Sequence, residues 1–317
     1  MWRFCMNLHK DTEAFNSLSA ITSEYIGIPI SAVKRDYYIV MMLKKLADSE
    51  YADKCVFKGG TSLSKGYPGS ILRFSEDIDL TFIPNNNLGK KQYDKALKKI
   101  EKIMTEDALM EKISEERNDR NKSSYVWFGG NKEEKVKLEI GSSVRPDPFD
   151  LKEIKTYIQE YLESKNMVDV IQEFELQSVK INILCIERTF LDKVMSVKRH
   201  AICGTLNKKV RHIYDVTVLF KRDDIQSFLK NKKELKELID KTKHTDSFYL
   251  EKRNISEEYN PIGVYNFPAW KCYFDDSIKD RYENLHRDLL YTNQKQNFDE
   301  ALDAFSKISE IFKELGE

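Results

Sequence analysis

The sequence predicts an α/β catalytic half, residues 1–150, followed by a mainly helical half, residues 151–317. In the first half, short alternating or apolar segments are interleaved with amphipathic helices, a pattern typical of helices packed on a small mixed sheet. In the second half, apolar residues recur at helical spacing over long stretches. A length of 317 residues is enough for two domains of this kind.

The elements of the first half follow from the spacing of their apolar residues. Val33, Tyr37 and Val40 recur near helical spacing, whereas residues 77–83, DIDLTFI, alternate acidic with apolar side chains as a strand does. Gly59 is expected to begin a helix that Pro68 and Gly69 interrupt. The expected order is helix 10–26, helix 31–48, strand 55–57, helix 59–65, strand 77–83, helix 89–115, strand 124–129 and strand 135–141.

The boundary between the halves is expected in residues 142–150, which contain two prolines. Ligand sites commonly lie between domains, so we expect the active cleft between the two halves. The expected elements of the second half are strand 174–184 and helices 186–202, 207–221, 223–242, 275–291 and 297–315.

The charge composition limits the kinds of partner. Because 52 basic residues balance 52 acidic ones, no global basic field attracts nucleic acid from a distance. Any contact with a nucleic-acid backbone would depend on a local patch. Such a patch is predicted from Lys198, Arg199, Lys208, Lys209 and Arg211.

The cysteines and the hydropathy predict the compartment. The five cysteines are scattered and form no C-x-x-C pair, which is typical of reduced intracellular thiols. The charged N-terminal residues do not resemble a signal peptide, and the longest apolar run, residues 37–43, is too short to span a bilayer. We expect a soluble cytoplasmic protein with no membrane partner.

The most informative motif lies between residues 58 and 80. Asp77 and Asp79 stand two apart on an expected strand, so both carboxylates point the same way and can hold a hard cation, Mg²⁺ or alternatively Mn²⁺. Gly59 and Gly60 lack a Cβ, so phosphate oxygens can approach the backbone N–H groups at the start of the following helix. Each feature alone also occurs in ordinary turns and surface strands, but their order favours a site for phosphoryl or nucleotidyl transfer.

Three further residues are candidates for this chemistry. Glu139 lies on an expected strand and would complete an acidic cluster if that strand neighbours residues 77–83; otherwise it belongs to a solvated sheet face. Lys193 can neutralise a triphosphate or be an ordinary surface charge. Asp215 can orient Lys193, contact the nucleotide or be a plain surface acid. Serine-hydrolase, P-loop and Rossmann motifs are absent from the sequence.

Five sequence blocks, in this order, resemble the AbiEii/AbiGii family of nucleotidyltransferase toxins from type IV toxin–antitoxin and phage-defence systems, a group that includes the MenT toxins. The resemblance extends over about residues 35–220 and is most specific in the first two blocks. The blocks are FKGGTSLSK (57–65), RFSEDIDL (73–80), KLEI (137–140), ERTFLDKVM (187–195) and RHIYDV (211–216).

The resemblance implies a DNA polymerase β-like nucleotidyltransferase fold and Mg²⁺-dependent transfer of a nucleotide from an NTP. It implies an RNA acceptor, since some relatives modify the tRNA 3′ end, and a cognate antitoxin encoded nearby. Two departures from the general pattern are Gly59-Gly60-Thr61-Ser62 in place of Gly-Ser, and Glu139 in place of an aspartate. The residues placed at the site by motif or by resemblance are Gly59, Gly60, Thr61, Ser62, Arg73 and Ser75 for the nucleotide, Asp77, Asp79 and Glu139 for metal and catalysis, Lys193 for both phosphate and catalysis, and Asp215 for catalysis.

Two rival hypotheses remain open from the sequence. The enzyme can instead nucleotidylate a small molecule or a protein, which the neutral net charge permits equally well. A binding module that holds a nucleotide without turnover would show nucleotide affinity but no pyrophosphate release.

Overall fold

The computed structural model describes residues 7–75, 77–84, 88–129, 132–142, 145–250, 259–287 and 289–317. The chain forms two compact units, which are described separately. Unit 1 comprises Met1–Gly66 and Phe74–Leu184, and unit 2 comprises Tyr67–Arg73 and Cys185–Glu317. The segment Tyr67–Arg73, which ends one residue before the Ser-x-Asp-x-Asp motif, therefore belongs to the second unit.

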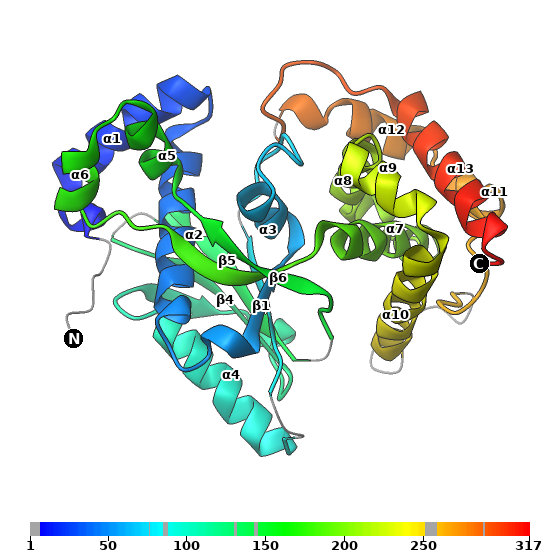
Figure 1. Cartoon of the computed structure of the whole chain (residues 1–317), viewed down its shortest axis with the longest axis horizontal. Coiled ribbons are helices and arrows are strands. Elements are labelled where there is room, and N and C mark those ends of the chain that lie inside the picture. The colour runs from blue at the N-terminus through cyan, green and yellow to red at the C-terminus, as the bar shows by residue number, and fades with distance from the viewer. Residues whose placement is uncertain are drawn as a thin grey trace. The chain divides into compact units, whose positions relative to one another are not determined.

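Unit 1 is built on a mixed sheet, seven-stranded over the described residues, in the order β3-β4-β5-β2-β1-β7-β6. Helices α2 and α4 pack against it (Figure 1). Strand β2 pairs antiparallel with β1 and parallel with β5, so it lies in the middle of the sheet. The elements are α1 (Thr12–Ile26), α2 (Ile30–Ala47), β1 (Cys55–Lys58), α3 (Gly59–Gly66), β2 (Asp77–Phe82), α4 (Lys90–Met104), β3 (Leu109–Lys112), β4 (Asn121–Trp127), β5 (Val136–Gly141), β6 (Phe149–Ile154), α5 (Tyr157–Ser164), α6 (Val168–Glu173) and β7 (Val179–Leu184).

The predicted helix 89–115 is wrong beyond Met104. Helix α4 ends there, Asp107 has a positive φ of 64°, and β3 begins at Leu109. All four side chains of β3 are exposed, so its sequence carries no alternation by which a strand is recognised. Backbone pairing with β4 forms the strand instead.

Strand β6 was missed for the same reason. Its first five side chains are mostly exposed, and its six residues form the antiparallel ladder with β7. The predicted boundary at residue 150 lies within β6, whereas the compact units divide after Leu184. The assignment of the two predicted domains to separate functions stays a prediction.

Unit 2 is helical in the part of the chain that the structure describes. The predicted helix 223–242 is two helices, because the backbone of Asn231 leaves the helical region with ψ 82°. Tyr265, Phe267 and Trp270 pack with Phe305 and Phe312 to form an aromatic core. Its helices are α7 (Ile186–Ile202), α8 (Val210–Phe220), α9 (Asp223–Lys230), α10 (Lys232–Leu250), α11 (Phe267–Trp270), α12 (Asp276–Glu283) and α13 (Phe298–Glu314).

Candidate nucleotidyl-transfer site

The three candidate acids lie on two adjacent strands of unit 1. In the parallel pairing of β2 with β5, Asp79 lies opposite Glu139 and Asp77 lies opposite Lys137. Paired residues project from the same face of a sheet with neighbouring Cβ atoms, and residues two apart on a strand share that face. The neighbouring strands required for Glu139 to join the other acids are therefore confirmed, while its catalytic role stays a prediction.

The acidic face is the one turned away from α4. Ser124 on β4 pairs with Leu138, which pairs with Ile78, so these three residues share a face. The hydroxyl of Ser124 donates to Glu101 of α4 at 2.7 Å, which identifies this face as the one that α4 covers. The acids occupy the alternate positions, where Asp77, Asp79 and Glu139 are only partly buried.

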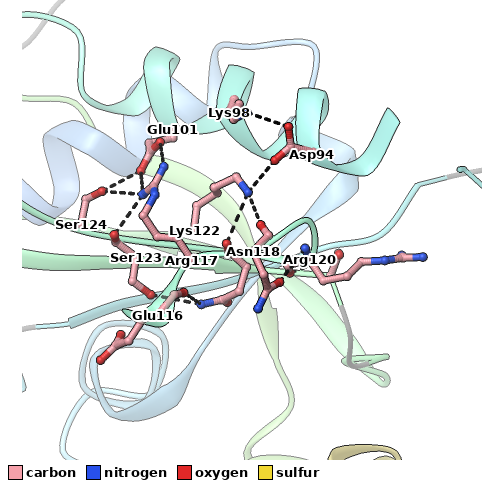
Figure 2. Close-up of polar contacts among 12 residues, drawn as sticks. Asp94, Lys98, Glu101, Glu116, Arg117, Asn118, Arg120, Lys122, Ser123 and Ser124 are labelled. Carbon is pink, nitrogen blue, oxygen red and sulfur yellow. Dashed lines mark hydrogen bonds and ion pairs between the residues drawn. The ribbon is translucent and has the colours of Figure 1, made fainter. Parts of the chain in front are cut away.

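A charged network anchors β4 and the turn before it to α4 (Figure 2). Arg117 donates to both carboxylate oxygens of Glu101 at 2.6 and 2.7 Å, and also to Ser124 at 2.8 Å. Burial opposes ionisation of Glu101, but the bonds from Arg117 and Ser124 lower its pKa overall. On the same strand, Lys122 is bound to Asp94 of α4 at 2.8 Å. This network fixes β4, the strand next to the one that carries Glu139.

Two lysines beside the acids were not assigned roles from the sequence. Lys58, the last residue of β1, lies opposite Asp79. Lys137 contacts Glu116 at 2.6 Å and Glu139 at 3.8 Å. The sequence signal was weak, because lysines are abundant and only the strand order places these two next to the acids.

The acidic face holds excess negative charge. Burial, together with the charge of Asp79, raises the pKa of Glu139, although Lys58 and Lys137 oppose the shift. Over the described residues, no three His, Cys, Asp or Glu side chains converge as a closed metal-ligand set. Mg²⁺ in nucleotide sites is commonly held by one or two carboxylates with substrate phosphates and waters, so two carboxylates on this face fit that ion.

Gly59 connects the glycine motif to the acids. Its φ is +86°, and a Cβ at this position would lie 2.3 Å from an oxygen of Asp79. The sequence motif predicts that the missing side chain makes room for an approaching phosphate. In the structure, the carboxylate of Asp79 occupies the space that a side chain would need, so glycine is required here to place that carboxylate.

A Gly59→Ala variant is expected to lose about 10²-fold in catalytic rate, because the Cβ displaces Asp79 and misplacements of about 1 Å carry such costs. The matched control is Gly27→Ala, which has a similar φ of +79° but nothing within 4 Å of the added Cβ. Both variants should lose about 1–2 kcal/mol of stability through backbone strain, which thermal unfolding measures. Equal activity of the two alanine variants would contradict the proposed link to Asp79.

The hydroxyl groups of the motif make local contacts. Thr61 donates to Ser75 at 3.0 Å, which ties α3 to the segment before β2. Ser62 is fully buried and donates to the carbonyl of Gly59 at 2.9 Å, which stabilises the first turn of α3. Gly60 lies beside Gly59 in this turn and is partly exposed. Nucleotide contacts by these residues stay a prediction.

The other predicted residues form a buried cluster in unit 2. Asp215 of α8 is 0% exposed and accepts from Arg73 through both carboxylate oxygens, at 2.6 and 2.7 Å. Lys193 of α7 contacts the same carboxylate at 2.8 Å. The surface-acid interpretation of Asp215 is therefore wrong, and its contact with Lys193 is confirmed.

This cluster keeps Asp215 ionised despite its burial. Desolvation alone would raise the pKa of the carboxyl group, but the two cations more than offset it and hold the pKa well below its usual range. Two cations therefore contact one buried carboxylate, and cations of this kind bind anionic substrate groups.

Part of the predicted basic patch does not form a surface. Lys198 is buried beneath the carbonyl groups of Asn260, Gly263 and Val264, and Arg199 is paired with Asp246. Lys208 and Arg211 are exposed. The usable part of the patch is therefore smaller than the sequence indicated.

The class of protein follows from comparison with known families. The family model described as the nucleotidyl transferase AbiEii toxin of type IV toxin–antitoxin systems matches residues 42–304. The chain belongs to this family and is a nucleotidyltransferase toxin that uses an NTP and has an antitoxin as partner.

A solved structure supports the fold. MenT4, a nucleotidyltransferase toxin from Mycobacterium tuberculosis H37Rv, superposes with a TM-score of 0.51 and 17% sequence identity, covering 94% of this chain and 98% of that chain. Comparison with curated proteins gives no match. Among the described residues, no helix is long and apolar enough to cross a membrane.

Proposed function

We propose that the protein transfers a nucleotide from an NTP to the 3′ end of tRNA in the cytoplasm and thereby arrests translation, through a catalytic domain of the DNA polymerase β-like type. The observation that carries the proposal is the pairing of Asp79 with Glu139 on adjacent strands, with Asp77 on the same face. The start of α3 lies against Asp79 at Gly59, which supports one site in unit 1 where the glycine motif would bind phosphate beside the acids.

In this proposal Asp77 and Asp79 hold Mg²⁺, or alternatively Mn²⁺, with help from Glu139. The bound cation would neutralise charge on the triphosphate and orient it for in-line displacement. Glu139 would accept the proton of the acceptor hydroxyl, because it lies opposite Asp79 on the same face of the sheet. The backbone of Gly59 and Gly60, with Thr61, Ser62 and Ser75, would hold the triphosphate.

The cluster in unit 2 would serve the phosphate charge. Lys193 is assigned to the phosphate charge by its place in the ERTFLDKVM block, and Asp215 would hold Lys193 and Arg73 in position. Arg73 is already engaged with both oxygens of Asp215, so its contribution to the nucleotide would be through its charge.

The test is incubation of the purified protein with Mg²⁺, total tRNA and each α-labelled NTP in turn, beside an Asp77→Asn control. A labelled tRNA band that the control lacks is the expected result, and it identifies the nucleotide. If the label appears on protein or on a small molecule, tRNA is not the acceptor and one of the rival acceptors is. NTP binding without pyrophosphate release from any acceptor would reject nucleotidyl transfer by this protein.

A further inference from the structure

A pocket of about 500 Å³ on unit 2 has a lining suited to a phosphodiester. It lies where α12 packs against α8, near the start of α8 (Figure 1). Lys208 precedes α8, Arg211 is on its first turn, and Arg281 comes from α12. Three cations from two helices and the segment before α8 therefore surround one cavity, with Asp280 as the acid in its lining.

The charge of these three cations is not used by the fold. Lys208, Arg211 and Arg281 are exposed, and within the described ranges none of them forms an ion pair. The buried cations of unit 2 differ in this respect, because Arg73 and Lys193 both bind Asp215. Unpaired arginine and lysine around a concave surface favour an anion.

The remaining lining distinguishes a nucleotide unit from a free anion. Leu285 and Leu289 supply an apolar surface, and Asn207 and Asn284 supply amides that both donate and accept hydrogen bonds. A phosphate uses only the cations, whereas the sugar and base attached to it can also use the leucines and the amides.

The pocket adjoins the Arg73–Lys193–Asp215 cluster within unit 2. Arg211 and Asp215 are four residues apart on α8, which is a separation of about 6 Å along the helix axis. Leu289 directly precedes Leu290, whose backbone bridges to Arg73. A group bound in the pocket would therefore lie next to residues that the proposed function assigns to the reacting phosphates.

We propose that this pocket binds a backbone phosphate of the acceptor RNA, with the adjoining nucleoside resting against its leucines and asparagines. The inference rests on the proposed nucleotidyl transfer to RNA and adds the surface that holds the acceptor. It assigns acceptor binding to Lys208, Arg211 and Arg281, none of which the proposed function assigns to the NTP.

The test compares the Lys208→Gln/Arg211→Gln/Arg281→Gln protein with a control that carries Lys233→Gln, Lys236→Gln and Lys313→Gln. The control loses the same charge at exposed positions of unit 2 outside the pocket. We measure KM for tRNA, KM for the NTP, kcat, and tRNA affinity by filter binding over a series of salt concentrations. Circular dichroism checks the fold, and Arg211→Gln alone replaces the triple variant if that variant does not fold.

The pocket variant is expected to raise KM for tRNA at least about 10-fold, to leave kcat and KM for the NTP within about 2-fold, and to reduce the slope of tRNA affinity against salt concentration by about 1. The control should match the wild type. If the wild type labels tRNA but the pocket variant has an unchanged KM for tRNA, the pocket is overturned while the proposed function stands. The same holds if the variant instead shows a raised KM for the NTP. A wild type that neither binds nor labels RNA overturns both.

Discussion

An Asp77→Asn protein is expected to fold as the wild type does and to lose about 10³-fold in nucleotidyl transfer, equivalent to about 4 kcal/mol of transition-state stabilisation. Asparagine has nearly the same shape, and Asp77 is only partly buried, so the packing of β2 is kept. Lys137 opposite it retains Glu116 at 2.6 Å. The expected loss of activity therefore comes from removing the negative charge that holds the cation. Pyrophosphate release at saturating NTP measures it.

The control for this experiment is Glu111→Gln on the edge strand β3. Glu111 is exposed and paired with Lys132 at 2.6 Å, so its substitution removes the same charge from unit 1 on a strand three places away from β2 in the sheet. It should change the rate less than about 2-fold. An Asp77→Asn protein with more than about a tenth of wild-type activity would remove Asp77 from the proposed metal site.

The elements of the acidic site could be predicted from the sequence because their signals are local. Alternation in DIDL and KLEI identifies two strands with acids on one face of each, and both strands are present. What could not be read from one sequence was their register. Asp79 meets Glu139 only because β2 and β5 are parallel neighbours, and that pairing joins segments about sixty residues apart. For the same reason Lys58 and Lys137 were not recognised as neighbours of the acids.

The geometry around Arg73 shows the limit of motif reading. Its position two residues before Ser75 led the sequence analysis to assign it to the nucleotide. The structure directs its guanidinium to Asp215, 142 residues away, and assigns the segment Tyr67–Arg73 to unit 2. Only 3% of Arg73 and 0% of Asp215 is exposed to solvent, and such burial requires the two charges to be paired, which no local pattern reveals.

That buried pair gives the largest expected effect on stability. An Asp215→Asn variant should lose about 3–5 kcal/mol in the free energy of unfolding, because it removes the carboxylate that both buried cations, Arg73 and Lys193, contact. Lys193→Met should cost less, because Arg73 keeps its two bonds to Asp215. Urea unfolding measures the loss of unfolding free energy in both variants. The control is Asp303→Asn, which breaks an exposed pair with Lys307 at 2.6 Å and should cost at most about 1 kcal/mol.

The same cluster predicts how stability depends on pH. The pKa of Asp215 in the folded protein is lowered by Arg73 and Lys193, below the ordinary value of about 3.9 that it regains on unfolding. The unfolded chain then binds more protons in acid, so the contribution of Asp215 is fully present above about pH 5 and declines as the pH falls below about 4. The difference in unfolding free energy between the wild type and Asp215→Asn should therefore narrow in acid. If that difference stays constant from pH 6 to about pH 3, the ionised form of Asp215 is not what stabilises the cluster. If Asp215→Asn loses less than about 1 kcal/mol in unfolding free energy at pH 7, the contacts of Asp215 with the two cations do not stabilise the fold as proposed.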